Sequence, residues 1–185
     1  MLADIQRVAQ ATGAEAVAAS LIAGLQARID AVISTAARVA HKPRVLHLEW
    51  TEPLMCGGHW IAEMVDMAGG LNCFGRKEQG SYRLEWADVV ASQPEVILLM
   101  PCGFNVERAL QDVPGLAARE GWNTLPAVQQ HQVYVLDAGA YTSRSGPRLV
   151  VGLEMFAEML HPELFTRMIP AGGAERLSEA AVKAQ

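Results

Sequence analysis

The sequence has few cysteines, no cluster of basic residues and no uninterrupted apolar run, and each absence excludes a class of protein. Its three cysteines, Cys56, Cys73 and Cys102, lack CxxC spacing, so we expect no disulfide framework. The 15 basic residues are scattered and are outnumbered by 20 acidic ones. Nucleic-acid binding is therefore not expected, because it depends on clustered Lys and Arg.

Targeting and membrane signals are also missing from the sequence. The first residues show no basic region followed by an apolar run, so we expect no signal peptide in this chain, and a cytoplasmic protein if the chain is complete. A membrane span needs about 20 predominantly apolar residues. The best candidate, residues 16–40, is interrupted by Gln26, Arg28, Asp30 and Arg38, so we expect a soluble protein.

The pattern along the chain predicts an α/β fold. Half of the 185 residues are apolar and 19% are charged, which is typical of a folded domain. Short apolar runs alternate with helical patterns, which indicates a mainly parallel sheet with helices on both faces, a three-layer arrangement. We expect strands at 44–48, 71–74, 96–100 and 133–136, and helices at 2–11, 15–41, 59–68, 85–92, 105–111, 124–130 and 147–160.

This pattern divides the chain into three parts. Residues 1–41 form a helical segment whose long helix runs from residue 15 until Pro43 stops it. Residues 42–166 form a Rossmann-like α/β lobe. Residues 167–185 form a flexible tail, with 171–185 frayed or loosely helical.

The most informative stretch is residues 45–70. An apolar strand stops at Glu49-Trp50 and opens into a loop that contains Pro53, Gly57 and Gly58, and an amphipathic helix follows. Open α/β sheets bind ligands beyond the carboxyl ends of their strands. No nucleophile–base pair or phosphate loop is present here, so the stretch indicates a binding site.

Two further strand-to-helix connections should lie at the same edge. They are residues 101–105, where Asn105 can cap the next helix, and the polar segment 137–148. Aromatic side chains with a few polar groups suit a bulky, partly apolar ligand. The three loops carry such a set: Trp50, Met55, His59, Trp60, Phe104, Tyr141 and Arg144.

Several of these residues have a purely structural alternative. Trp60 can be a core residue, and His59 can be a loop or capping residue. Cys56 and His59 have the spacing of two zinc ligands, but no second pair follows, so we expect no metal site. Cys102 follows a buried strand, where an inert cysteine is more common than a nucleophile.

Four motifs in this order resemble the substrate-binding proteins of ABC importers that carry cobalamin, haem and ferric siderophores (class III), and the cobalamin-binding branch above all. The resemblance covers residues 1–166. Its motifs are residues 49–60 (EWTEPLMCGGHW), 85–97 (EWADVVASQPEVI), 101–104 (PCGF) and 141–162, from YTSRSGPR to the helix ending HP.

The resemblance implies a lobe of a two-lobed protein. Residues 15–41 correspond to the connecting helix and the rest to the carboxyl-terminal lobe, whereas the amino-terminal lobe has no counterpart in the chain. It implies a periplasmic or cell-surface location and docking on a transporter permease through Glu85 or Asp88, since Ala87 stands where the family has Glu. The implied ligand contacts are Glu49, Trp50, Leu54, Met55, His59, Trp60, Tyr82, Phe104, Tyr141 and Arg144.

The leading hypothesis is therefore a non-catalytic lobe that binds cobalamin or a related corrinoid as ligand, with no cofactor and no catalytic residue. Haem or a ferric siderophore is the alternative ligand, for which Arg144 would matter more. A rival is a chelatase-like or metal-dependent enzyme lobe using His59, Glu49 and Cys102.

A further rival is a ligand-free, self-associating module. The apolar stripe of the long helix has only one lobe to cover it, which predicts a homodimer through residues 1–40. The stripe consists of Val17, Leu21, Leu25, Ile29 and Val32.

Overall fold

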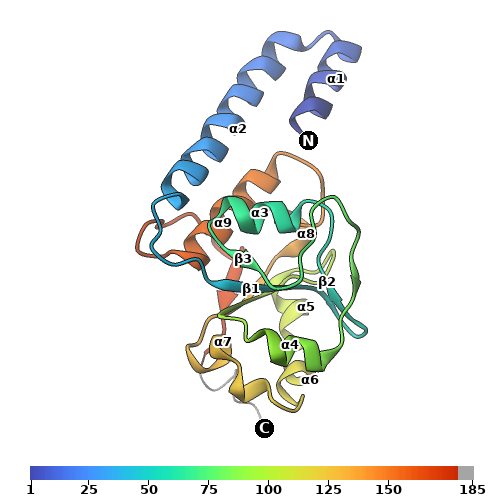
Figure 1. The fold of residues 1–185 in the computed structure, drawn as a ribbon. Coiled ribbons are helices and arrows are strands. Elements are labelled where there is room, and N and C mark those ends of the chain that lie inside the picture. Colours follow the sequence, from blue (N-terminus) through green and yellow to red (C-terminus); the bar gives the residue numbers. More distant parts are fainter. Residues whose placement is uncertain (179–185) are drawn as a thin grey trace.

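A mixed β-sheet with helices on both faces forms most of the molecule in the computed structural model, which describes residues 1–178 (Figure 1). The strand order is β4-β2-β1-β5-β6-β7, and β3 pairs in addition with the start of β1. β3, β1, β5 and β6 are parallel, whereas β2, β4 and β7 are antiparallel to their neighbours. The strands are β1 Arg44–Thr51, β2 Leu54–Cys56, β3 Leu71–Asn72, β4 Tyr82–Arg83, β5 Val96–Leu99, β6 Val133–Leu136 and β7 Ala174–Arg176.

The helices divide between the two faces of the sheet. Successive residues of a strand point to opposite faces, so Val45 packs with α3 and α9 while Leu46 packs with α4 and α6. The predicted three-layer α/β fold is thus confirmed. The helices are α1 Leu2–Thr12, α2 Glu15–Ala36, α3 Ile61–Met67, α4 Trp86–Ser92, α5 Val106–Leu110, α6 Val113–Ala117, the 3₁₀ helix η1 Trp122–Thr124, α7 Pro126–Gln129, α8 Ala138–Tyr141 and α9 Arg148–Leu160.

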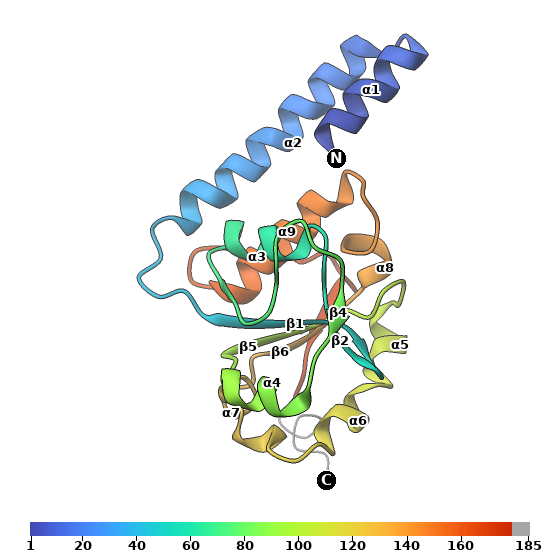
Figure 2. The same cartoon turned by 45° about the vertical axis from the view of Figure 1, so that its right-hand side comes forward.

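The α1–α2 helical hairpin projects from the lobe (Figure 2). Gly13 closes α1 in the left-handed conformation, and the carboxyl half of α2 packs on α9. Arg28 of α2 forms two hydrogen bonds, of 2.7 and 2.6 Å, with the carboxylate of Glu154 in α9. Among the described helices, α2 is the one long and apolar enough to cross a membrane, by length and composition only.

Three predicted boundaries are wrong. α2 ends at Ala36 rather than at residue 41, because residues 37–43 turn the chain back toward β1. β1 does not stop at Leu48 but continues to Thr51, since Trp50 pairs with Met55 in an antiparallel hairpin with β2. The tail is not frayed or helical at 174–176, which form β7 against β6, whereas residues 179–185 lie outside the described part.

The apolar stripe of α2 is covered over part of its length. Leu25 and Val32 are buried at 4% and 2% exposure, which corrects the expectation that both are left open. Val17 and Leu21 are exposed at 73% and 43%. The uncovered apolar residues of this stripe therefore lie in the amino-terminal half of α2.

Candidate functional site

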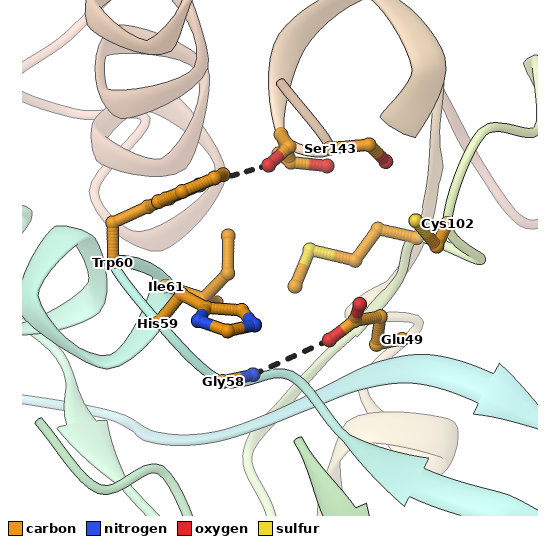
Figure 3. Close-up of a pocket in the computed structure, with 9 residues that line it drawn as sticks. Glu49, Gly58, His59, Trp60, Ile61, Cys102 and Ser143 are labelled. Carbon is orange, nitrogen blue, oxygen red and sulfur yellow. Dashed lines mark hydrogen bonds between the residues drawn. The ribbon is translucent and has the colours of Figure 1, made fainter. Parts of the chain in front are cut away.

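A cavity of about 180 Å³ lies where the three predicted loops meet, namely the loop after β1 and the connections at residues 101–105 and 137–148 (Figure 3). The first loop reaches it from β1 and the start of α3, the second from the end of β5, and the third from the end of α8. The sequence prediction that these connections share one edge of the sheet is thus confirmed. The cavity is lined by Glu49, Gly58, His59, Trp60, Ile61, Met100, Cys102, Thr142 and Ser143.

Hydrogen bonds hold the three loops together around the cavity. The indole Nε1 of Trp60 donates to the backbone oxygen of Thr142 at 2.8 Å. The backbone N–H of Gly103 donates to Ser143 Oγ at 3.0 Å. The backbone N–H of Cys102 donates to the backbone oxygen of Glu49 at 3.1 Å. The cavity wall is therefore fixed by bonds between segments far apart in sequence.

The Glu49 carboxylate lines the cavity and also forms two hydrogen bonds within the fold. It accepts a hydrogen bond from the backbone N–H of Gly58 at 3.3 Å and another from the hydroxyl of Ser81. A Cβ at Gly58 would lie 2.2 Å from the nitrogen of Ser81, so only glycine allows this approach. Glu49 thus ties the 79–81 segment to the cavity rim, a role that sequence reasoning missed.

His59 presents an exposed imidazole to the cavity (Figure 3). Its backbone has φ +57°, and its N–H donates to the oxygen of Gln79 at 2.6 Å. Its ring lies 5.7 Å from that of Trp60, centroid to centroid. The ring makes no hydrogen bond or ion pair with any residue in the described part of the chain.

The other predicted residues of the three loops do not line this cavity. Trp50 and Phe104 are half-buried and pack on each other, with ring centroids 5.3 Å apart. Tyr141 is half-buried in α8, next to Thr142. Met55 pairs with Trp50 in the β1–β2 hairpin and is half-buried.

Two predicted contacts serve the fold instead. Leu54 is 5% exposed and packs in the core between the sheet and α4–α6, so it is not available to a ligand and that assignment is wrong. Tyr82 is half-buried in β4, where its hydroxyl donates to the oxygen of Phe74 at 2.7 Å. The guanidinium of Arg76 lies 4.7 Å from the Tyr82 ring centroid.

Arg144 lines a second, more open cavity of about 540 Å³. Arg148 and Asp137 are among its other lining residues, and both arginines are exposed. Asp137 accepts a hydrogen bond from the N–H of Ala140 at 2.9 Å, so its carboxylate caps α8. The structure therefore separates Arg144 from the cavity that Trp60 and His59 line.

A buried histidine in β1 has no counterpart in the sequence prediction. His47 of β1 is fully buried, its Nε2 lies 3.0 Å from Oδ1 of Asn72, and its Nδ1 lies 3.7 Å from the thiol of Cys56. Burial lowers the pKa of His47 to about 4 and raises the pKa of Cys56 to about 12. His47 lies in an apolar strand, and the sequence pattern therefore gave no sign that its imidazole would contact polar groups.

The predicted docking carboxylates lie at the start of α4. Glu85 is the N-cap residue and Asp88 stands in the first turn, and both are exposed. Within residues 1–178, neither side chain takes part in an ion pair. The same part of the chain contains no group of three His, Cys, Asp or Glu side chains that could hold a metal ion.

Comparisons with known proteins place this geometry in a family. Residues 1–140 match the family described as periplasmic binding protein. A stretch of 47 residues, 25% of the chain, is 47% identical to an uncharacterized ABC transporter substrate-binding lipoprotein of Bacillus subtilis, of which it covers 15%.

Two solved structures show how far the likeness extends. An ABC transporter substrate-binding protein from Listeria monocytogenes matches 88% of this chain at a TM-score of 0.77 and 22% identity. The periplasmic haem-binding protein RhuT from Roseiflexus matches 87% at a TM-score of 0.72 and 27% identity. The chain spans only 64% and 62% of these two proteins. It belongs to the periplasmic binding protein family and has the fold of one lobe of such a protein, preceded by its long helix.

Proposed function

We propose that this chain is the ligand-binding lobe of an ABC importer's substrate-binding protein and that its ligand is cobalamin or a related corrinoid. Binding involves no chemical conversion. In support, the cavity's Ser143 hydroxyl accepts from Gly103, and in the described chain neither Ser143 nor Cys102 is hydrogen-bonded to His59. That arrangement lacks the nucleophile–base contact that a hydrolytic enzyme needs.

The observation that carries the choice of ligand is the lining of the smaller cavity. One wall is the indole of Trp60, and among the described lining residues none is Lys or Arg. Haem presents two carboxylates and siderophore complexes are commonly anionic, so both favour cationic partners. The corrin ring is fringed by neutral amides, which suit the backbone oxygens and hydroxyl groups near Thr142 and Ser143.

The size of the cavity indicates that it holds part of the ligand. Pockets that enclose a drug-sized molecule measure about 300 to 1,000 Å³, and this one measures about 180 Å³. We propose that an edge of the corrin enters between Trp60 and Ser143 while the rest faces away from the lobe. Family members with a second lobe would cover that remaining surface.

The test is a titration with cyanocobalamin, haem, a ferric hydroxamate siderophore and divalent metals, followed by calorimetry and melting temperature. We expect binding and a raised melting temperature with cyanocobalamin alone. Trp60→Ala should abolish binding. Trp86→Phe is the control and should leave binding unchanged, because the Trp86 indole lies outside the cavity lining and donates a hydrogen bond to the backbone oxygen of Glu120. Binding of a divalent metal without cyanocobalamin would instead support the enzyme alternative.

Haem is the second candidate ligand, supported by Arg144 and Arg148, which both line the larger cavity. RhuT is a periplasmic haem-binding protein, and so is BhuT, which was solved in complex with two haems and is 26% identical over 88% of this chain. If haem is the ligand, Arg144→Ala should weaken haem binding more than Trp60→Phe does. The reverse order would place haem in the smaller cavity, which Trp60 lines.

We propose that Glu85 and Asp88 dock the lobe on the transporter permease, at the periplasmic or cell surface. Both carboxylates are exposed at the start of α4 and lie outside the cavity lining, so docking leaves the ligand site free. Replacing both with Ala should weaken binding to a permease in nanodiscs without changing ligand affinity. Unchanged permease binding would reject this assignment.

We also propose a homodimer through residues 1–40. Its support is the exposure of four apolar side chains on the projecting helices: Val8, Val17, Leu21 and Ile33. A soluble protein rarely leaves a large apolar patch in water. Light scattering at tens of micromolar should give a dimer mass that V17E/L21E reduces to a monomer and Gln111→Glu, on the exposed end of α5, does not.

A further inference from the structure

Glu49 stands at a bulge in the β1–β2 hairpin. Leu48 pairs with Cys56 and Trp50 with Met55, so Glu49 is an extra residue of β1 without a partner in β2. A bulge bends its strand and redirects the side chain that it contains. The Glu49 carboxylate accordingly reaches the smaller cavity, whose wall it forms together with residues of the other two loops (Figure 3).

The two oxygens of this carboxylate differ in their contacts. Oε2 accepts hydrogen bonds from the backbone N–H of Gly58, at 3.3 Å, and from the hydroxyl of Ser81. Oε1 forms no hydrogen bond with any residue in the described part of the chain. Figure 3 shows it pointing into the cavity, away from Gly58. One oxygen thus fixes the side chain, and the other is free to accept a hydrogen bond from a ligand.

The negative charge of Glu49 faces the cavity without a lysine or arginine to balance it. Within residues 1–178 the carboxylate forms no ion pair, and none of the described lining residues is Lys or Arg. A carboxylate of a ligand would be repelled, more strongly beside this half-buried group than in bulk water. An amide N–H would instead form a charge-assisted hydrogen bond with Oε1. The cavity therefore separates ligands by the group that they present at its wall.

We infer that Glu49 determines which class of tetrapyrrole the smaller cavity admits, an inference that rests on the proposed function. Its Oε1 accepts a hydrogen bond from a primary amide at the edge of the corrin, and its charge excludes an edge that carries a carboxylate there. The ligands selected are amidated corrinoids, and those rejected are their carboxylic acid counterparts. A cavity of about 180 Å³ suffices for this selection, because only one peripheral group has to enter. Specificity then comes from a repulsive element as well as an attractive one.

The experiment compares dicyanocobinamide, whose periphery carries amides, with dicyanocobyrinic acid, which carries carboxylates in their place. Titrations are run at pH 8, where histidine in general is uncharged. The wild-type protein should bind dicyanocobinamide more tightly, by about tenfold or more. Glu49→Gln has nearly the same shape and keeps an acceptor for the N–H of Gly58, but it removes the charge. This variant should bind dicyanocobyrinic acid about tenfold more tightly than the wild-type protein does.

A gain of binding cannot result from a loss of folding, so the readout separates selectivity from stability. Glu120→Gln is the matched control, because it removes the same charge from an exposed residue outside the cavity lining, and it should leave both affinities unchanged. Equal binding of the two corrinoids by the wild-type protein would overturn the inference while leaving the proposed function intact. The inference would also be overturned if Glu49→Gln brought no gain or if Glu120→Gln brought the same gain. Failure of the wild-type protein to bind dicyanocobinamide would reject the proposed function itself.

Discussion

The indole nitrogen of Trp60 and the backbone oxygen of Thr142 lie 2.8 Å apart, although 82 residues separate them in the sequence. This bond joins the start of α3 to the end of α8 across the mouth of the cavity. It orients the indole, so that its ring forms one wall of the site. Binding geometry and loop packing therefore depend on the same hydrogen bond.

Trp60→Phe tests that dependence. Phenylalanine keeps an aromatic ring but leaves the Thr142 oxygen without its donor, which should lower the free energy of unfolding by about 1 kcal/mol. Cyanocobalamin affinity should fall as well, because the remaining ring is no longer fixed. Urea unfolding and calorimetry measure the two effects. Trp50→Phe is the matched control, since its ring packs on Phe104 without lining the cavity.

Trp50 and Trp122 should respond differently to truncation. Trp122 is 1% exposed in the core, so Trp122→Ala should destabilise the protein by about 3 to 5 kcal/mol. Trp50 is half-buried at the sheet edge, and Trp50→Ala removes mainly its contact with Phe104, worth about 1 kcal/mol. Chemical denaturation of both variants checks the order. Equal losses would mean that Trp50 is a core residue.

His47 should make stability depend on pH. Burial lowers its pKa in the folded state to about 4, whereas the unfolded chain takes up the proton near 6.5. The unfolded state therefore binds more protons between these values. Stability is greatest above about pH 6.5 and falls as the pH drops toward 4, by about 3 kcal/mol at most. His47→Gln, which does not titrate, should flatten this part of a urea-derived stability profile, and an unaltered slope would contradict the assignment.

The three cysteines should react with a thiol reagent at separate rates. Cys102 is exposed and should be modified fast. Burial raises the pKa of Cys56 to about 12, and burial also raises the pKa of Cys73. Cys56 should react only as the protein opens, and the half-buried Cys73 should react more slowly than Cys102. A DTNB time course should show one fast thiol that Cys102→Ser removes, and three thiols in denaturant; a fast phase that persists in this variant would show that another cysteine is accessible.

Elements of the fold that depend on neighbouring residues could be predicted from the sequence, whereas those that depend on pairing between segments could not. Val133–Leu136 and the Asn105 cap follow from local patterns, and both are observed. The β1–β2 hairpin does not, because Trp50 and Met55 pair across Pro53, in a stretch with Pro and Gly that is typical of a loop. β7 forms only because β6 offers an open edge to a tail without apolar periodicity.

The site was predicted in outline for the same reason. The loops that follow β1, β5 and β6 meet because the carboxyl ends of parallel strands lie at the same edge of the sheet, as the α/β pattern predicts. The roles of Glu49, Ser81 and Thr142 depend on contacts between distant segments, which no local spacing encodes. Leu54 was misassigned because a strand in a hairpin alternates between faces, and its face is the core.

The projecting α1–α2 hairpin contains no tryptophan, so tryptophan fluorescence does not report on its unfolding. All four tryptophans lie between residues 50 and 122, so none reports on α1 or α2. These two helices bury few side chains: Ala9, Ala18, Leu25, Val32 and Ala36. Segments with so few buried contacts open at lower free energy than the core. Far-ultraviolet circular dichroism should therefore begin to change before tryptophan fluorescence during denaturation, and a two-state fit to fluorescence alone would describe the lobe but not the whole chain.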